Sequence, residues 1–356
     1  MQPGGRRTDL TITAGLDVGG AHLKVALVED GRPIGVRAVV CPLWQGLDRL
    51  DAALREAAPL LERASRHAVT MTGELSDLFP DRKTGVESLV ARLVQELGPE
   101  ARFWMGALGF GRADQAAAHP AETGSTNFLA TARLVSRSEP DALLIDFGST
   151  TADIIPIRGG VPCPKGLTDG ERQTTGELVY TGFTRTAVMA VANRAPFKGQ
   201  WATLAREYLA TMADVRRILG ELPDGADLHA TADGKGKSPA ESTARFARML
   251  GRDAADGTHY DWQATAAFVR EQQMRSIHDG ALQVLSAACL PPGAPVVTAG
   301  IGADGAAILA LRLARASVTF AECAGAGDDC SLAVTHNAPA VAVALLLAGE
   351  QLCSGA

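Results

Sequence analysis

Two segments of the chain share a pattern in which an aspartate and glycines join two strand-like apolar runs. Residues 17–24 read DVGGAHLK, and residues 146–153 read DFGSTTAD. Glycine permits positive φ and lets backbone N–H groups approach an anion, while the aspartate can hold Mg²⁺ directly or through water. One glycine-rich hairpin turn is a common feature, but two in equivalent positions are not. The pattern therefore predicts two phosphate-binding hairpins.

Size and composition favour an intracellular enzyme of two lobes. A chain of 356 residues that is 46% hydrophobic can bury a large core, and its length predicts about two domains. The 34 Lys and Arg against 40 Asp and Glu leave a net charge of −6 without a long basic run, which argues against nucleic-acid partners. No segment has the roughly 18 uninterrupted apolar residues of a membrane span. Residues 1–10 lack the apolar core of a signal peptide and are expected to be disordered, so we expect a cytoplasmic protein.

The cysteines show no C-x-x-C spacing, which favours reduced thiols over disulfides or a metal site. They are Cys41, Cys163, Cys289, Cys323, Cys330 and Cys353.

Apolar periodicity predicts alternating strands and helices. Strands are expected at residues 11–17, 24–28, 34–40, 67–71, 103–108, 143–146, 154–157, 295–300 and 317–320. Helices are expected at residues 47–63, 85–97, 127–137, 201–219, 242–250, 262–290, 304–314 and 339–350.

We assign residues 1–140 to an N-terminal lobe with the first hairpin. Residues 141–356 form a C-terminal lobe with the second hairpin and a helical insertion at about residues 170–290. Residues 222–239 are rich in Asp, Gly and Lys and are expected to form a mobile loop. The Ala- and Leu-rich C-terminal helix could pack against a second subunit, which would make the protein a homo-oligomer.

This order of elements resembles the superfamily of acetate kinases, sugar kinases, actin and heat-shock ATPases. The turn AGIG at residues 299–302, ahead of a helix, lies where that superfamily holds its nucleoside. The resemblance implies an α/β fold of two related, ribonuclease H-like lobes around a central cleft, with one phosphate hairpin from each lobe. It does not determine the reaction.

Several motifs resemble a narrower family, related to hydantoinases and oxoprolinases. They are TMTGELSD at residues 70–77, KTGV at 83–86, DFGSTTADIIPI at 146–157, GELVYTG at 176–182 and TADG at 231–234. Members of this family join the furan and phenol halves of methanofuran in methanogens. Their counterparts in methylotrophs belong to tetrahydromethanopterin-linked one-carbon metabolism, where the product is methylofuran.

The family resemblance implies a transferase with small-molecule substrates and Mg²⁺ as cofactor. An (aminomethyl)furanmethanol diphosphate would condense with γ-glutamyltyramine, or a related tyrosine-derived phenol, to form an aryl ether and release diphosphate. Two phosphate hairpins suit a diphosphate leaving group without any hydrolysis of ATP. A furfuryl C–O bond ionises readily, so the main demand is to stabilise charge on the diphosphate.

Site roles follow from the hairpins and this chemistry. Lys24 is expected to bind the diphosphate as a flexible point charge, the alternative being a solvated strand lysine. Asp17 and Asp146 would orient Mg²⁺, and either could accept the phenol proton, since a phenol has a pKa of about 10. Asp153 either binds the metal or pairs with a neighbour. Hairpin groups expected to donate to phosphoryl oxygens are Gly19, Gly20, His22, Gly148, Ser149, Thr150 and Thr151.

A second group of candidates lies outside the hairpins. Glu74 and Asp77 would share one face of a helical turn after a strand, with Glu74 catalytic and Asp77 and Thr72 binding substrate. The alternative is that Thr72 caps a short helix. Further substrate-binding residues are expected to be Arg172 and Arg185, as clamps for the γ-glutamyl carboxylate or else surface residues, and Gly300 and Gly302, around the nucleoside or the furan.

Two other classes of function stay open. An ATP-dependent small-molecule kinase or a hydantoinase/oxoprolinase-type hydrolase would bind and turn over ATP through the same turns. The sequence shows no Cys/His/Asp cluster of the dinuclear hydrolase kind, which weighs against hydrolysis. A nucleotide-sensing regulator or scaffold would bind a ligand and show no metal-dependent release of diphosphate.

Overall fold

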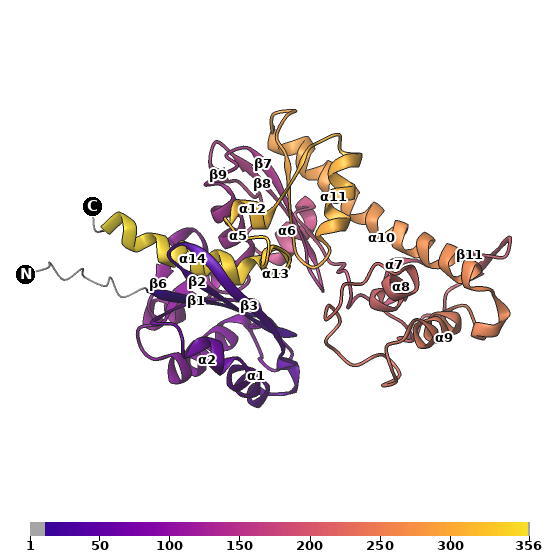
Figure 1. The fold of residues 1–356 in the computed structure, drawn as a ribbon, viewed down its shortest axis with the longest axis horizontal. Coiled ribbons are helices and arrows are strands. Elements are labelled where there is room, and N and C mark those ends of the chain that lie inside the picture. Colours follow the sequence, from indigo (N-terminus) through magenta and orange to yellow (C-terminus); the bar gives the residue numbers. More distant parts are fainter. Residues whose placement is uncertain (1–10, 355–356) are drawn as a thin grey trace, which may run out of the picture. The chain divides into compact units, whose positions relative to one another are not determined.

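The computed structural model describes the backbone of residues 11–354 and the side chains of residues 11–350. The chain divides into two compact units (Figure 1). Unit 1 comprises the described residues up to Ser138 together with those from Phe320 onward, and unit 2 is Glu139–Thr319. The division after Ser138 lies close to the predicted boundary at residue 140. The C-terminal segment differs, because the structure groups it with unit 1 and not with the second lobe. Residues 1–10, expected to be disordered, lie outside the described residues.

Unit 1 is built on a six-stranded sheet with the strand order β3-β2-β1-β4-β5-β6. Strand β1 is antiparallel to β2 and parallel to β4, and β4 is parallel to β5. The strands are β1 (Ile12–Val18), β2 (His22–Glu29), β3 (Arg32–Val40), β4 (Arg66–Met71), β5 (Arg102–Trp104) and β6 (Phe110–Gly111). Their central members are apolar along their length because helices cover both faces of the sheet.

Unit 2 repeats this arrangement with the order β10-β8-β7-β13-β14, and β9 also pairs with β8. Strand β7 is antiparallel to β8 and parallel to β13, and β13 is parallel to β14. The strands are β7 (Ala142–Phe147), β8 (Ala152–Arg158), β9 (Val161–Pro162), β10 (Leu178–Val179), β13 (Val296–Ala299) and β14 (Ser317–Thr319). Each unit thus carries the same strand order and directions, and the fold is the predicted α/β type with two related actin-like, sugar-kinase-like lobes.

The four longest α-helices of unit 1 lie at predicted positions, whereas its four shorter α-helices were not predicted. The helices of this unit are α1 (Leu47–Leu61), α2 (Arg82–Leu97), α3 (Ala113–Ala118), α4 (Pro120–Thr123), α5 (Asn127–Val135), α12 (Phe320–Cys323), α13 (Ser331–His336) and α14 (Ala338–Ser354), with short 3₁₀ turns at Leu43–Gln45 and Gly106–Leu108. Figure 1 shows α1 and α2 on one face of the sheet and α14 on the other. The expected strand over residues 103–108 ends at Trp104, since Gly106 and Gly109 adopt positive φ and turn the chain.

Unit 2 contains an inserted subdomain with its own hydrophobic core. This core includes Val188, Phe197, Met212, Phe246 and Trp262, whereas the core under the sheet is a separate cluster. The long helix α10 (His259–Ala288) contributes its first half to the subdomain core and its second half to the sheet core. The other elements of unit 2 are α6 (Asp169–Thr175), α7 (Val188–Val191), β11 (Arg194–Phe197), β12 (Gln200–Thr203), α8 (Met212–Leu219), α9 (Pro239–Met249), the 3₁₀ turn Ala254–Asp256 and α11 (Ala303–Arg312).

The inserted subdomain holds the main error of the secondary-structure prediction. The predicted helix over residues 201–219 begins as a β-hairpin, and α8 forms only at Met212. Lys198 and Gly199 both adopt positive φ and join β11 to β12, which is the turn chemistry of a tight hairpin. Trp201 packs under the Arg194 guanidinium, 4.5 Å from the ring centroid. The Lys198–Gly199 pair therefore indicates a hairpin in the sequence, but the spacing of the apolar residues after it favoured a helix.

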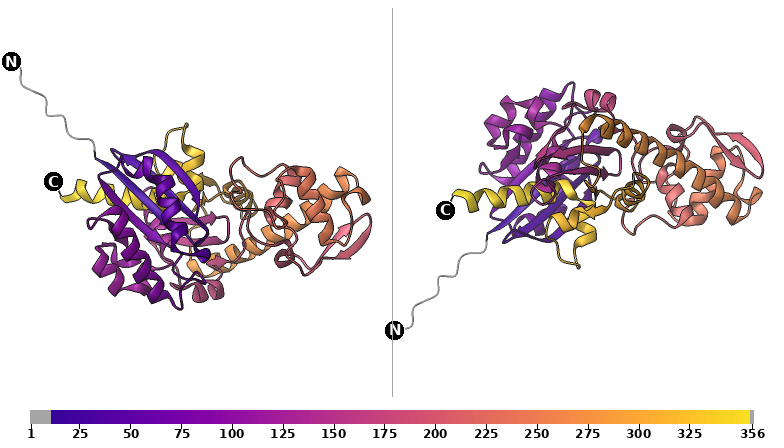
Figure 2. Two further views of the ribbon diagram at one scale, coloured as in Figure 1. Left: turned by 90° about the horizontal axis from the view of Figure 1, so that it is seen from below. Right: turned by 90° about the horizontal axis from the view of Figure 1, so that it is seen from above.

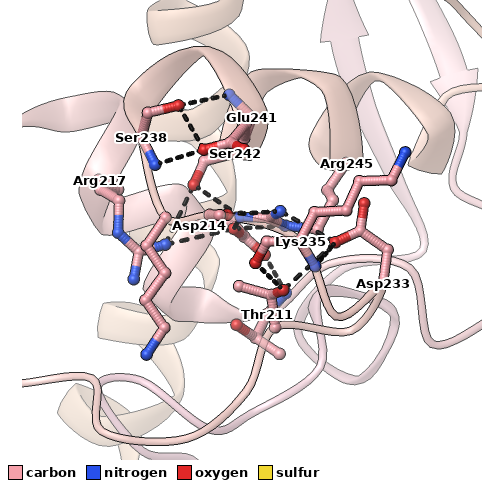
Figure 3. Close-up of polar contacts among 12 residues, drawn as sticks. Thr211, Asp214, Arg217, Asp233, Lys235, Ser238, Glu241, Ser242 and Arg245 are labelled. Atoms are coloured by element: carbon pink, nitrogen blue, oxygen red, sulfur yellow. Dashed lines mark hydrogen bonds and ion pairs between the residues drawn. The ribbon is translucent and has the colours of Figure 1, made fainter.

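The loop over residues 222–239, predicted to be mobile, is held by ion pairs to the helices on either side. Arg217 of α8 contacts the Asp227 carboxylate, and Lys237 lies 3.6 Å from the same group. Arg245 of α9, whose side chain is 0% exposed, contacts Asp233 at 3.1 Å (Figure 3). A buried arginine engaged in this way fixes the loop to the subdomain.

Helix α14 lies along the sheet of unit 1 and contacts β1, β2, β4 and α5 (Figure 2). Residues 338–347 of this helix are buried, so its apolar surface is used within the unit. The close packing depends on Gly15 of β1, where an added Cβ would lie 2.0 Å from the backbone oxygen of Ala340. The prediction that this helix offers its apolar surface to a second subunit is therefore wrong for its described part.

We expect Gly15→Ala to lower the free energy of unfolding of the protein by about 3 kcal/mol or more, because overpacking against backbone forces a whole helix to move. Gly35→Ala provides the matched control, since a Cβ there meets nothing within 4 Å and Gly35 lies in the same sheet. We expect this control to change stability by less than about 0.5 kcal/mol. Urea unfolding followed by circular dichroism measures both. Equal stability of the two variants would show that α14 does not depend on this contact.

Candidate functional site

The first hairpin places an ion pair at the end of β1. Asp17 and Lys24 are directly opposite each other in the β1–β2 register, and the Lys24 Nζ lies 3.2 Å from the Asp17 Oδ2. Asp17 is only 3% exposed, whereas a quarter of the Lys24 side chain is exposed. The other carboxylate oxygen, Oδ1, is buried and has no hydrogen-bond partner among the described residues. Such an oxygen is suited to a cation, a water molecule or a proton.

The turn between these strands is closed by its backbone. The Gly19 N–H donates to the His22 carbonyl at 2.9 Å. Neither Gly19 nor Gly20 adopts positive φ, so that part of the predicted reason for glycine is wrong here, and the close approach of the backbone to an anion stays a prediction. A Cβ on Gly19 would lie 3.1 Å from the His22 carbonyl oxygen, and the space beside Gly20 is open to at least 4 Å. Glycine at position 19 therefore avoids a tight contact with that carbonyl, and the open space beside Gly20 could admit an anion.

The end of β4 lies beside the first hairpin. The N–H groups of Thr72 and Gly73 both donate to the Val18 carbonyl, at 2.9 and 3.1 Å. The Thr72 hydroxyl is 3.6 Å from the position that a Cβ on Gly19 would take. The structure therefore brings Thr72 to the turn, as expected for a residue that contacts a ligand held there.

Glu74 lies deeper than a solvent-facing catalytic group. It is 0% exposed, and its Oε1 accepts a hydrogen bond from the Ser125 hydroxyl at 2.6 Å and lies 3.8 Å from the Arg82 Nε. Residues 74–77 form turns, so Thr72 caps no helix. Asp77 is exposed, and the predicted shared face of Glu74 and Asp77 is therefore wrong. Sequence reasoning missed Ser125 because it lies 51 residues from its partner.

The second hairpin has a different set of charges. Asp146 of β7 is opposite Asp153 of β8, and the Gly148 N–H donates to the Thr151 carbonyl at 2.9 Å. Asp153 forms an ion pair with Arg172, whose side chain is 2% exposed. Of the two alternatives for Asp153, the structure shows pairing with a neighbour. Arg172 is buried in that pair, so the alternative of a surface position for it is wrong.

The predicted third turn lies directly against the second hairpin. Gly300 has φ of +80°, and a Cβ there would be 2.4 Å from the Asp146 Oδ1. The Gly302 N–H donates to the Phe147 carbonyl at 2.8 Å. Only glycine accommodates both this backbone conformation and this approach to the carboxylate. Asp146, Gly300 and Gly302, separated by more than 150 residues, thus meet at one edge of the unit 2 sheet.

A segment after β10 is hydrogen-bonded to the second hairpin. The Phe183 N–H donates to the Gly148 carbonyl at 2.9 Å, and the Arg185 N–H donates to the Ser149 carbonyl at 3.0 Å. The Arg185 guanidinium donates from Nη1 to the Thr150 hydroxyl at 3.0 Å. Burial lowers the pKa of Arg185 from its usual value, an effect that the nearby Tyr208 and Tyr180 oppose. Arg185 is therefore hydrogen-bonded to the second hairpin through both its backbone and its side chain.

Possible metal ligands are few at each hairpin. Across residues 11–350, no three His, Cys, Asp or Glu side chains are grouped in a way that could hold a metal ion. Mg²⁺ tolerates this, since it often binds through one or two carboxylates with water and substrate phosphate completing its shell. The buried Asp17 Oδ1 fits such a role, and Asp146 would be its counterpart in unit 2. The cysteines Cys41, Cys163, Cys289, Cys323 and Cys330 are free thiols, and Cys353 lies beyond the described side chains.

None of the helices among residues 11–354 is both long enough and apolar enough to cross a bilayer.

Comparison with known proteins identifies relatives whose sequences match most of this chain. Residues 65–288 match the hydantoinase/oxoprolinase family. A (4-{4-[2-(gamma-L-glutamylamino)ethyl]phenoxymethyl}furan-2-yl)methanamine synthase from Methanocaldococcus jannaschii is 30% identical over 240 residues, which cover 67% of this chain and 71% of that protein. The synthase of the same name from Methanococcus vannielii is 33% identical over 123 residues, 34% of this chain and 55% of that protein.

Similar solved structures are more distant. A ROK family glucokinase from Streptomyces griseus is 14% identical with a TM-score of 0.45, over 94% of this chain and 98% of that chain. Component A of the (R)-2-hydroxyglutaryl-CoA dehydratase of Acidaminococcus fermentans is 12% identical with a TM-score of 0.42, over 94% and 96%. The family match over residues 65–288 and the 30% identity to the Methanocaldococcus jannaschii synthase show that the chain is an enzyme of the hydantoinase/oxoprolinase family.

Proposed function

We propose that this enzyme transfers a furanylmethyl group from a diphosphate to a phenol in methanofuran or methylofuran biosynthesis. The donor is an (aminomethyl)furanmethanol diphosphate, and the acceptor is γ-glutamyltyramine or a related tyrosine-derived phenol. The product named for the relatives contains a phenoxymethyl-furan ether, which is the bond that such a transfer forms. The observation that carries the proposal is the ammonium of Lys24, which pairs with Asp17 beside a turn where the space next to Gly20 is open.

The reaction breaks the bond between the furfuryl carbon and the diphosphate oxygen and forms one to the phenol oxygen. The furan ring oxygen delocalises positive charge on that carbon, so the barrier depends on stabilising negative charge on the departing diphosphate. A well-placed donor at a reacting oxyanion contributes about 3–4 kcal/mol. In unit 1 these donors would be Lys24 and the Gly20 N–H, with His22 in the same turn, because the Gly19 N–H already donates to the His22 carbonyl. The hairpin of unit 2 offers Ser149, Thr150 and Thr151 as donors, whereas the Gly148 N–H already donates to the Thr151 carbonyl.

The phenol proton needs an acceptor. Asp17 and Asp146 are the candidates, because each ends a strand beside its hairpin and each is more than nine-tenths buried. Mg²⁺, when bound, would neutralise charge on the diphosphate. Glu74 is better placed to hold the end of β4 through Ser125 than to contact a substrate, and we assign it a positioning role. Thr72 is our candidate for a substrate contact at the first hairpin.

An alternative is the older chemistry of the fold, an ATP-dependent small-molecule kinase or a hydantoinase/oxoprolinase-type hydrolase. The Gly300–Gly302 turn favours it, because this turn lies against Asp146 at the position predicted to hold a nucleoside. The two proposals differ in their use of ATP. The purified protein, incubated with Mg²⁺, the furanmethanol diphosphate and γ-glutamyltyramine, should form the ether and release diphosphate without consuming ATP. Consumption of ATP without ether formation would establish the alternative.

We expect Lys24→Ala to reduce kcat/KM for the diphosphate donor by about 10² to 10³-fold, the equivalent of one lost oxyanion donor. Lys24→Arg retains the charge and should lose less. Lys83→Ala is the matched control, since Lys83 is 70% exposed and its ion pair with Glu87 lies at the surface. Ether formation measured by mass spectrometry, with thermal unfolding alongside because Lys24 pairs with buried Asp17, gives the result. Full activity of a folded Lys24→Ala variant would remove the leaving-group role from Lys24.

We expect chelation of divalent cations to abolish ether formation, and added Mg²⁺ to restore it. Asp146→Asn should raise the half-saturating Mg²⁺ concentration about tenfold or more, in line with the loss of a metal-orienting carboxylate. Asp153→Asn serves as the comparison, because its carboxylate contacts buried Arg172. That variant should unfold at a lower temperature and keep the Mg²⁺ response of the unaltered protein. If instead Asp153→Asn alone shifts the Mg²⁺ response, Asp153 is the metal ligand.

A further inference from the structure

A cavity lies at the end of the unit 2 sheet that is remote from the second hairpin. Strand β8 leaves that hairpin at Ala152 and reaches the cavity at Arg158. A strand rises about 3.3 Å per residue, so roughly 20 Å of chain separate these two points. The volume of the cavity is about 510 Å³, which is in the usual range for sites that bind small molecules. The cavity is therefore large enough for a ligand and separate from the groups assigned to the diphosphate.

Small side chains at the end of α10 leave this space open. The helix packs on the sheet through Val284, which is part of the core under the sheet. Its last turn adds only Ala287 and Ala288 to the cavity wall, and the helix ends at Ala288. Pro156 of β8 also lines the cavity, and its carbonyl accepts a hydrogen bond from the Cys163 N–H at 2.9 Å. The wall formed by α10 is therefore apolar and leaves room for the apolar part of a ligand.

Two cationic side chains line the same cavity. Arg158 and Lys165 are both exposed, and neither side chain forms a hydrogen bond or an ion pair with another of the residues that the structure describes. Other arginines of unit 2 differ, since Arg216 and Arg270 both pair with Glu221. A guanidinium and an ammonium are the donors that bind carboxylates and phosphates in proteins. The cavity thus offers cationic donors to an anion from outside the chain.

The carboxylate in the cavity wall is engaged elsewhere. Glu177 is 2% exposed and lines the cavity. Its oxygens accept hydrogen bonds from the Lys165 N–H at 2.6 Å, the Gly166 N–H at 2.9 Å and the Thr175 hydroxyl at 2.8 Å. Three donors use most of the acceptor capacity of a carboxylate and stabilise its charge. Glu177 therefore fixes the segment that carries Lys165, and the two cations of the cavity exceed its single negative charge.

The thiol of Cys163 also lies in the cavity wall. It is exposed, and its Sγ donates to the Pro156 carbonyl at 3.4 Å. Partial burial raises the pKa of this thiol from its usual value, and Arg158 opposes the rise. The Asp141 carboxylate also raises this pKa, and it accepts a hydrogen bond from the Gly159 N–H at 3.0 Å. The thiol therefore adds no charge to the cavity near pH 7, and its alkylation can report whether the cavity is occupied.

We propose that this cavity binds a small organic anion. The carboxylate or phosphate group of the ligand contacts Arg158 and Lys165, and its apolar part lies against Val284, Ala287 and Ala288 of α10. The site is additional to the proposed function and does not depend on it, because none of these residues has a role in the ether-forming reaction.

Protection of Cys163 from alkylation tests the site, because a ligand in the cavity covers that thiol. The full chain is treated with iodoacetamide at fixed pH, and the labelled peptides are quantified by mass spectrometry. Cys330 of unit 1, also a free thiol, is the internal reference. The probes are hexanoate and hexyl phosphate, with hexanol and hexylamine as their neutral and cationic counterparts. At about ten times its Kd, either anion should slow the alkylation of Cys163 about tenfold by mass action and leave that of Cys330 unchanged.

Variants of the cavity wall locate the bound anion. Arg158→Gln and Lys165→Gln should each raise the half-protecting concentration of both anions about tenfold, the effect of losing one hydrogen bond to a charged group. Ala288→Leu should raise it as well, because the added atoms take up space in the cavity. Arg55→Gln is the matched control and should change nothing, since Arg55 is an exposed arginine of α1 in unit 1. Circular dichroism confirms that each variant is folded.

Protection by one anion alone supports the site and identifies the preferred group as a carboxylate or a phosphate. Three outcomes would overturn the site: no protection by either anion, equal protection by hexanol or hexylamine, or unchanged half-protecting concentrations in both Arg158→Gln and Lys165→Gln. The proposed function fails or holds separately. Lys24→Ala should lose ether formation and retain the protection of Cys163, and a protein that forms no ether but shows this protection would keep the site and lose the proposed function.

Discussion

The parallel pairing of β1 with β4, and of β7 with β13, is the constraint on which both hairpin sites depend. Parallel strands end at the same edge of a sheet, so whatever follows the second strand lies beside the hairpin that follows the first. Asp17 is in register with Thr70, and Asp146 is in register with Ala299. Thr72 and Gly300 consequently reach the hairpins from distant parts of the chain. A slip of one residue in either pairing would turn the aspartate to the opposite face of the sheet.

The local pattern of the sequence was sufficient for the sheets and for the hairpins, because strand periodicity and the aspartate–glycine turns are encoded by neighbouring residues. It was insufficient wherever a role depends on a remote partner. The sequence predicted roles in catalysis for Glu74 and in substrate binding for Arg172, and it gave no sign of the partners that the structure shows, Ser125 on Glu74 and Asp153 on Arg172.

The packing of the C-terminal helix α14 also depends on a remote residue that the local sequence does not identify. Its apolar composition predicts burial but does not say against what. The helix packs on β1 at Gly15. Because Gly15 has no side chain, the helix backbone occupies the space that a Cβ would need. An isolated glycine in a strand pattern indicates either a bulge or a close approach, and the sequence cannot distinguish them. The structure shows the close approach.

The two hairpins differ in how positive charge reaches them, and this difference bears on the chemistry. In the first, Lys24 is part of the hairpin and carries a compact charge on a flexible side chain. In the second, Asp153 occupies the equivalent strand position and is paired with Arg172, so positive charge comes from Arg185 on a separate segment. A flexible ammonium suits a diphosphate whose charge increases as it departs, whereas a fixed planar guanidinium suits a carboxylate that does not react. Under the function proposed above, this asymmetry would correspond to two anionic substrates, one that loses its anionic group and one that keeps it.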